Sequence, residues 1–172
     1  IIQRELDEKE IVLIEQYDAP NSTISGDAVR LQQIFWNLLK NSVKFTPAKG
    51  SITVRTRTAA EPGQIEILLS DTGIGIAAHD LPRVFDAFAQ GEHAKQKGPH
   101  HFGGLGLGLA ICRKLGELHS GVIHAFSEGK GRGATFVIRF PLVKGDERSE
   151  PRASGETPAA APKHPPRTEG IR

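Results

Sequence analysis

A long amphipathic helix, predicted early in the chain, is the sequence feature that most constrains the fold. Asp27 is a suitable N-cap, and Thr46 ends the helix because a residue that precedes proline disfavours helical backbone angles. Between them, side chains at helical spacing form one broad and mostly apolar face, made of Leu31, Ile34, Phe35, Leu38, Leu39 and Ser42. Such a face has to be buried against another layer of the domain.

Strand patterns surround this helix. We expect strands at residues 10–17, 51–58, 64–70, 122–127 and 134–141. Turns at residues 61–63 and 129–133 pair the last four strands as two hairpins. A short helix is expected at 78–85, a polar stretch at 90–101 and a second long helix at 105–119. Together these elements predict an α/β fold, a two-layer sandwich with a mixed, mostly antiparallel sheet and helices on one face.

Composition divides the chain into two parts. With 172 residues, 38% of them hydrophobic, the chain can form one real core, which we assign to residues 1–143. Residues 144–172 contain no aromatic residue and five of the eleven prolines (Pro151, Pro158, Pro162, Pro165 and Pro166). That segment is interpreted as a disordered linker, because it cannot bury enough apolar area to offset its ordering entropy. The absence of methionine indicates a piece of a longer protein.

Charge and cysteine content narrow the function classes. The net charge of +2 favours neither nucleic acid nor a membrane surface as partner. No apolar run approaches the roughly 20 residues that cross a bilayer. The only cysteine, Cys112, excludes an internal disulfide and a multi-cysteine metal site, and its place on an amphipathic helix predicts a small core residue.

The first helix carries a polar stripe beside its apolar face. Asn37, Asn41 and Lys44 lie at i, i+4 and i+7, and asparagine is a poor helix former that needs an explanation here. An amide oxygen could bind Mg²⁺, which prefers hard oxygen ligands, while Lys44 meets phosphate charge. The alternative is a solvated face with two exposed amides.

Asp71 ends an alternating strand and begins the turn Asp71-Thr72-Gly73-Ile74-Gly75. Its carboxylate could accept a hydrogen bond from an adenine amino group, and the glycines would let the backbone approach the base. An ordinary Asp-x-Gly turn is the competing interpretation.

A glycine-rich loop, residues 103–108, leads directly into the second long helix. Backbone N–H groups at a helix N-terminus form a natural phosphate site. The loop does not match the P-loop pattern, and Leu109 breaks the dinucleotide-binding fingerprint.

The order of these motifs resembles the GHKL superfamily of ATPases, and within it the catalytic ATP-binding domain of sensor histidine kinases. The resemblance covers residues 10–142. It is carried by LQQIFWNLLKNSVKFT (31–46), DTGIGI (71–76), VFDAFAQG (84–91), GGLGLGLAI (103–111) and GKGRGATFVIRFP (129–141), which are similar to the N box, first glycine box, phenylalanine box, second glycine box and closing hairpin. Ser42 departs from the family pattern, which usually has alanine there.

The resemblance implies ATP and Mg²⁺ as cofactors and a role for each matched residue. Asn41 and Asn37 would hold Mg²⁺ and phosphate oxygens, and Lys44 would contact the phosphates. Asp71 would recognise adenine, and Thr135 would add a hydrogen bond near the base. The remaining nucleotide contacts would come from Gly73, Gly75, Ile76, Phe88, Gly104, Leu105, Gly106, Leu107 and Gly108, with residues 90–101 as a lid that closes over the nucleotide.

The same resemblance implies a protein-histidine kinase that transfers the γ-phosphoryl group of ATP to a histidine on a separate dimerising helical hairpin. That phosphoacceptor box is missing here, since Pro82 spoils its nearest likeness at residues 79–83. A response-regulator receiver domain would accept the phosphate next, and residues 169–172 resemble the approach to such a domain in a hybrid kinase. The domain would be cytoplasmic, in a parent protein that could be membrane-anchored.

Two rival functions stay open. The chain could be a non-catalytic module that senses ATP by contact. It could also be a chaperone- or topoisomerase-type ATPase, although those relatives use a glutamate one helical turn before the Mg²⁺ asparagine, where this chain has Asn37.

Overall fold

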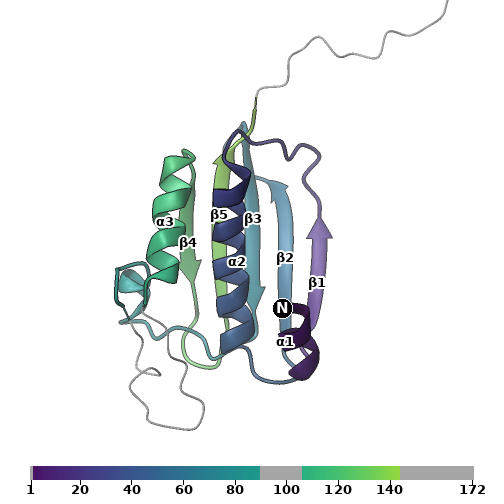
Figure 1. Cartoon of the computed structure of the whole chain (residues 1–172), viewed down its shortest axis with the longest axis vertical. Coiled ribbons are helices and arrows are strands. Elements are labelled where there is room, and N and C mark those ends of the chain that lie inside the picture. Colours follow the sequence, from purple (N-terminus) through teal and green to yellow (C-terminus); the bar gives the residue numbers. More distant parts are fainter. Residues whose placement is uncertain (1, 90–105, 144–172) are drawn as a thin grey trace, which may run out of the picture.

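The computed structural model describes residues 2–89 and 106–143 and contains one five-stranded sheet in these ranges, with strand order β1-β2-β3-β5-β4. The strands are β1 (Val12–Tyr17), β2 (Ser51–Thr58), β3 (Gln64–Asp71), β4 (Val122–Phe126) and β5 (Ala134–Pro141). The β1–β2 pair is parallel and the other three pairs are antiparallel, so the sheet is mixed as predicted (Figure 1).

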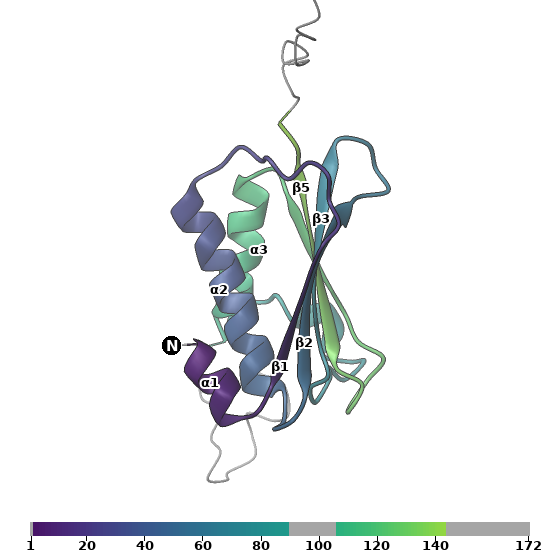
Figure 2. The same cartoon turned by 90° about the vertical axis from the view of Figure 1, so that its right-hand side faces the viewer.

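Helices cover one face of this sheet. They are α1 (Ile2–Glu8), α2 (Ala28–Phe45) and α3 (Gly108–Leu118), with a 3-10 turn at Leu81–Arg83. Figure 2 shows α2 and α3 side by side in one layer and the sheet in the other. The predicted two-layer α/β sandwich is therefore confirmed. None of the described helices is long and apolar enough to cross a membrane.

The core lies between α2, α3 and the sheet. Ile34 and Leu38 of α2 are fully buried, and they meet alternate residues of the strands, such as Ile67 and Ile138. Alternation follows from the strand geometry, in which successive side chains point to opposite faces. Cys112 of α3 is fully buried, as its amphipathic setting predicted.

Some element predictions differ from the structure. The helix expected at residues 78–85 is only the 3-10 turn Leu81–Arg83, with Pro82 in its first turn. Phe35, assigned to the apolar face of the first helix, is 36% exposed and lies at the margin of that face. The expected lid (90–101) and linker (144–172) lie outside the described residues, and the division of the chain at residue 143 stays a prediction.

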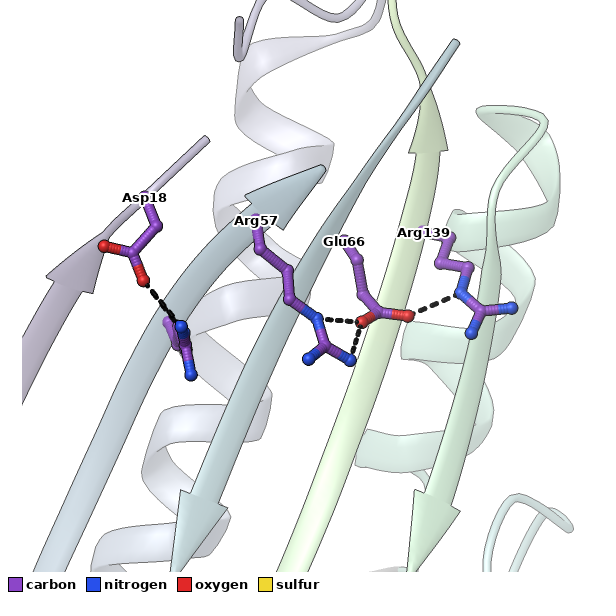
Figure 3. A network of polar contacts seen from close by, with 5 residues as sticks. Asp18, Arg57, Glu66 and Arg139 are labelled. Atoms are coloured by element: carbon purple, nitrogen blue, oxygen red, sulfur yellow. Dashed lines mark hydrogen bonds and ion pairs between the residues drawn. The ribbon is translucent and has the colours of Figure 1, made fainter. Parts of the chain in front are cut away.

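The helix-free face of the sheet carries a compact ionic cluster. Glu66 alternates with Ile65 and Ile67, so its carboxylate points away from the helices, yet it is only 3% exposed. Arg57 Nε donates to Glu66 Oε1 (2.6 Å) and Arg139 Nε donates to Oε2 (2.7 Å), as Figure 3 shows. Burial is the largest single influence on the Glu66 pKa and raises it. The bonds and charges of Arg139 and Arg57 together outweigh burial and hold the pKa below its ordinary value.

We expect this cluster to make the stability of the domain sensitive to acid. A carboxyl group with a lowered pKa in the folded state stabilises the fold fully above its unfolded pKa, near 4.5, and loses that contribution as the pH falls through the folded pKa. Glu66→Gln should therefore cost about 1–3 kcal/mol at neutral pH and much less in acid. Urea unfolding across this pH range measures the difference, and a loss that is independent of pH would contradict the ionic origin.

Candidate nucleotide-binding site

Three of the predicted site segments meet at one end of the sandwich. Asp71 is the last residue of β3, Phe45 ends α2, and Gly108 begins α3, all at the lower end of the molecule in Figure 1. The turn after β3 is tied to the end of α2, since the Ile74 N–H donates to the Phe45 carbonyl (3.1 Å). Segments far apart in sequence thus form one continuous surface.

The Asp71 carboxylate is held by three donors from three parts of the fold. The N–H groups of Gly73 (2.9 Å) and Ala134 (3.2 Å) both donate to Oδ1. The hydroxyl of Ser42, on α2, donates to Oδ2 (3.3 Å). Burial raises the pKa of Asp71 above its ordinary value, while these three hydrogen bonds act in the opposite direction.

The glycine turn after Asp71 is hydrogen-bonded to the loop between β4 and β5. The N–H of Gly131 donates to the Ile74 carbonyl (2.7 Å), and the N–H of Gly133 donates to the Gly73 carbonyl (3.1 Å). Gly75 has a φ of 69°, and a side chain there would collide with the Gly129 carbonyl. Only glycine suits this combination of left-handed backbone and close approach.

Ser127 also joins the glycine turn to the loop between β4 and β5. Sequence reasoning did not single out this residue. Its hydroxyl accepts from the N–H of Ile76 (2.9 Å) and donates to the Gly133 carbonyl (2.6 Å). Ile76 itself packs partly against the core. A lone serine after a strand gives little sequence signal, because its partners lie 51 and 6 residues away.

The polar stripe of α2 is half-buried, not a solvated face. Asn37 and Asn41 are both of intermediate exposure. The Cys112 thiol of α3 donates to the Ile34 carbonyl of α2 (3.6 Å), and burial raises the pKa of that thiol to about 11, with nearby Asn37 acting in the opposite direction. Burial lowers the pKa of the Lys44 ammonium, with a smaller contribution from the charge of Lys40. The Lys44 Nζ lies 4.9 Å from the centroid of the Phe45 ring.

The glycine-rich loop enters α3 next to the phenylalanine segment. Gly106 has a φ of 68°, and its carbonyl accepts from the Phe88 N–H (3.0 Å). Phe88 is 71% exposed, whereas Phe85 packs edge-to-face on Phe136 with ring centroids 6.4 Å apart. Leu107 is the N-cap of α3, and Gly104 and Leu105 lie outside the described residues.

Thr135 does not join this site, contrary to the expectation from the sequence. It pairs with Ser70 across β3 and β5, and the two hydroxyl oxygens are 3.0 Å apart. Asp71 and Ala134 are the next residues along, so their side chains point to the helix-covered face and those of Ser70 and Thr135 to the other. The residue of β5 that lies opposite Asp71 is therefore Ala134, and it contributes only its backbone N–H group to the Asp71 carboxylate.

Two hollows bracket α2. A small one of about 160 Å³ lies at its C-terminal end and is lined by Lys44, Phe45 and Ile74, among others. A larger one of about 460 Å³ lies where α2 begins and α3 ends, around Asp27 and His119. None of the predicted site residues lines the larger hollow, which lies at the opposite end of α2 from Lys44 and Phe45.

Lys9 caps the end of α2 just beneath the site. Its ammonium donates to the carbonyls of Val43 (2.7 Å), Lys44 (3.1 Å) and Thr46 (3.0 Å). The last carbonyls of a helix have no partner within the helix, and a cation there also complements the helix dipole. Sequence reasoning missed Lys9 because it lies more than 30 residues away from each of these partners.

Comparison with known proteins identifies the family of this chain. Residues 26–144 match the family described as histidine kinase-, DNA gyrase B- and HSP90-like ATPase. The chain belongs to this family of ATP-binding domains, as its motifs indicated.

Within that family, the chain corresponds to the catalytic domain of sensor histidine kinases. It is 41% identical over 143 residues to the autoinducer 2 sensor kinase/phosphatase LuxQ of Vibrio harveyi, covering 81% of this chain and 16% of LuxQ. It is 43% identical over 119 residues to the sensor histidine kinase RcsC of Escherichia coli K12, covering 69% of this chain and 12% of RcsC. The chain thus spans less than a fifth of the length of either relative.

A solved structure shares the fold of this chain. Full-length ShkA in complex with AMPPNP superposes with a TM-score of 0.67 at 32% sequence identity, over 81% of this chain and 27% of ShkA. The family and the fold therefore agree on an ATP-binding domain.

Replacing Lys9 with methionine should weaken the site end of the domain. We expect Lys9→Met to lower the free energy of unfolding by about 1–2 kcal/mol, because carbonyls at the end of α2 lose a charged donor. Lys114→Met is the control, since that side chain is 72% exposed and its change should stay within about 0.5 kcal/mol. Equal losses in denaturant unfolding of the two variants would refute the capping role.

Proposed function

We propose that this chain binds Mg²⁺–ATP and presents the γ-phosphoryl group to a histidine on a partner domain. The observation that carries the proposal is the Asp71 carboxylate, half-buried at the end of β3 and fixed by bonds from β5, the glycine turn and α2. A carboxylate so well held is a suitable acceptor for one defined donor group, and the adenine amino group is that donor.

The phosphates would lie along α2 toward the start of α3. The N-terminus of α3 supplies backbone N–H groups after Gly106 and Leu107, and such an end favours negative charge. Lys44 lies near the C-terminal end of α2, where its ammonium would neutralise phosphate charge. This arrangement supports phosphoryl transfer, which depends mainly on positioning and charge neutralisation.

The side chains also suit Mg²⁺. Asn41 and Asn37 carry neutral amide oxygens on a half-buried stripe of α2, and Mg²⁺ prefers hard oxygen ligands while taking few from the protein. Held by these amides, Mg²⁺ would supply positive charge that offsets the charge of the phosphates. The protein's own part is to hold the amides in place, which the half-buried setting of Asn37 and Asn41 on α2 supports.

Transfer to histidine is favoured over hydrolysis by the residue at position 37. In the hydrolytic relatives a glutamate one turn before the Mg²⁺ asparagine activates water, whereas Asn37 cannot act as a base. The relatives LuxQ and RcsC are named as a sensor kinase/phosphatase and a sensor histidine kinase. A helical phosphoacceptor domain, a response-regulator receiver domain and a cytoplasmic setting therefore belong to this proposal.

The chain by itself should bind ATP without labelling itself. With γ-labelled ATP we expect transfer only when a histidine-bearing hairpin domain is supplied, and the label should be acid-labile. A chain that binds ATP but never labels the supplied domain would instead be a sensing module. Appreciable steady-state hydrolysis without a partner would favour the chaperone-type ATPase.

Two substitutions should separate the ends of the nucleotide site. Asp71→Ala removes the acceptor for adenine, so the preference for ATP over GTP should fall by about tenfold or more, the size expected for a hydrogen bond to a charged group. Asn41→Ala should instead weaken the Mg²⁺ dependence of ATP binding. Gln32→Ala, on an exposed position of the same helix, is the control. Unchanged ATP affinity in both site variants, measured by calorimetry, would reject the site.

A further inference from the structure

We propose that Ser42 is a positioning residue for base selectivity: its hydroxyl keeps the Asp71 carboxylate ionised and oriented, so that the site accepts adenine and rejects guanine. This inference rests on the proposed function, since it concerns the same nucleotide site.

The geometry around Asp71 singles out the Ser42 hydroxyl. Ser42 is 1% exposed, and its hydroxyl is the side-chain donor to Oδ2, while Oδ1 receives two backbone N–H groups. A carboxylate oxygen has two acceptor positions. Oδ1 is therefore saturated by these bonds, and Oδ2 retains capacity for one further donor. The Ser42 bond fixes which way that remaining position faces.

The side-chain hydroxyl that reaches Asp71 comes from α2, and strand β5 provides none on that face of the sheet. Ala134 occupies the position opposite Asp71 on β5 and has no hydroxyl, and Thr135 points to the other face, where it bonds Ser70. Without a hydroxyl from α2 or from β5, the Asp71 carboxylate would keep only the two backbone donors to Oδ1. Ser42 thus supplies from the helix what the strand lacks.

The protonation state of Asp71 matters because it decides which base is accepted. At position 6 adenine carries an amino donor and guanine a carbonyl acceptor. An ionised carboxylate only accepts hydrogen bonds, whereas a protonated carboxyl group can also donate. Any change that favours the protonated form should therefore weaken ATP binding and relax the exclusion of GTP.

Opposing influences act on the charge of Asp71, and one of them is the Ser42 hydroxyl. Burial raises its pKa, and the N–H groups of Gly73 and Ala134 and the Ser42 hydroxyl oppose that rise. The charged side chains of α2 closest to Ser42 along the chain are Lys40 and Lys44, each two residues away. Along β3 and β5 the nearest are Glu66 and Arg139, on the other face of the sheet. Removing the Ser42 hydroxyl takes away one of three groups that favour the ionised form.

The test is the ratio of ATP to GTP affinity as a function of pH in the full chain. For Ser42→Ala we expect the ratio to fall roughly threefold to tenfold, the size of one hydrogen bond, with the largest loss in mild acid. The acid limb of ATP binding and the Asp71 carboxyl titration, followed by carbon NMR, should both move to higher pH. Ser70→Ala removes a hydroxyl next to Asp71 on the opposite face and should change neither.

A second variant distinguishes the loss of the hydroxyl from a loss of folding. Ser42→Cys keeps nearly the same shape with a weaker donor, so its selectivity should lie between wild type and Ser42→Ala. If the wild type prefers ATP and Asp71→Ala removes that preference, yet both Ser42 variants retain it, the role of Ser42 is refuted while the proposed function stands. If the wild type itself does not bind ATP, the proposed function fails instead.

Discussion

The half-buried carboxylate of Asp71, with its hydrogen bonds, is the interaction on which the site end of this domain depends. Its three hydrogen bonds reach the glycine turn, strand β5 and helix α2, so one side chain joins both layers of the sandwich. Burial works against its charge and raises its pKa, and these donors offset part of that cost. A group held in this way is both a structural anchor and a ready acceptor for a ligand.

Helix α2 has two roles that are usually separate. Its buried face, with Ile34 and Leu38, forms much of the core, and its polar stripe carries Asn37, Asn41 and Lys44. Ser42 lies on the buried face but serves the site through Asp71. The helix is also fixed at both ends, by the Asp27 cap at its start and by Lys9 at its end. A well-anchored helix suits a site that works by positioning.

Much of the fold followed from local patterns. The bounds of β2 and β5 and the N-cap of α2 were predicted closely, because alternation, turn glycines and an Asp cap are local signals. The short helix at 78–85 was overestimated, since the described structure there is a 3-10 turn through Pro82. The candidate site residues stand within motifs and stay a prediction, whereas Lys9 and Ser127 were missed because their partners come from distant parts of the chain.

The sequence by itself determined the secondary structure, the order of the motifs and the family, because each depends on residues close together in the chain. Only the tertiary structure decided which side chains meet. It turned Thr135 away from Asp71 and brought Ser42 to it, because strand register and helix packing set the direction of a side chain. The hydroxyl at the site thus comes from the helix, through contacts between residues 29 positions apart.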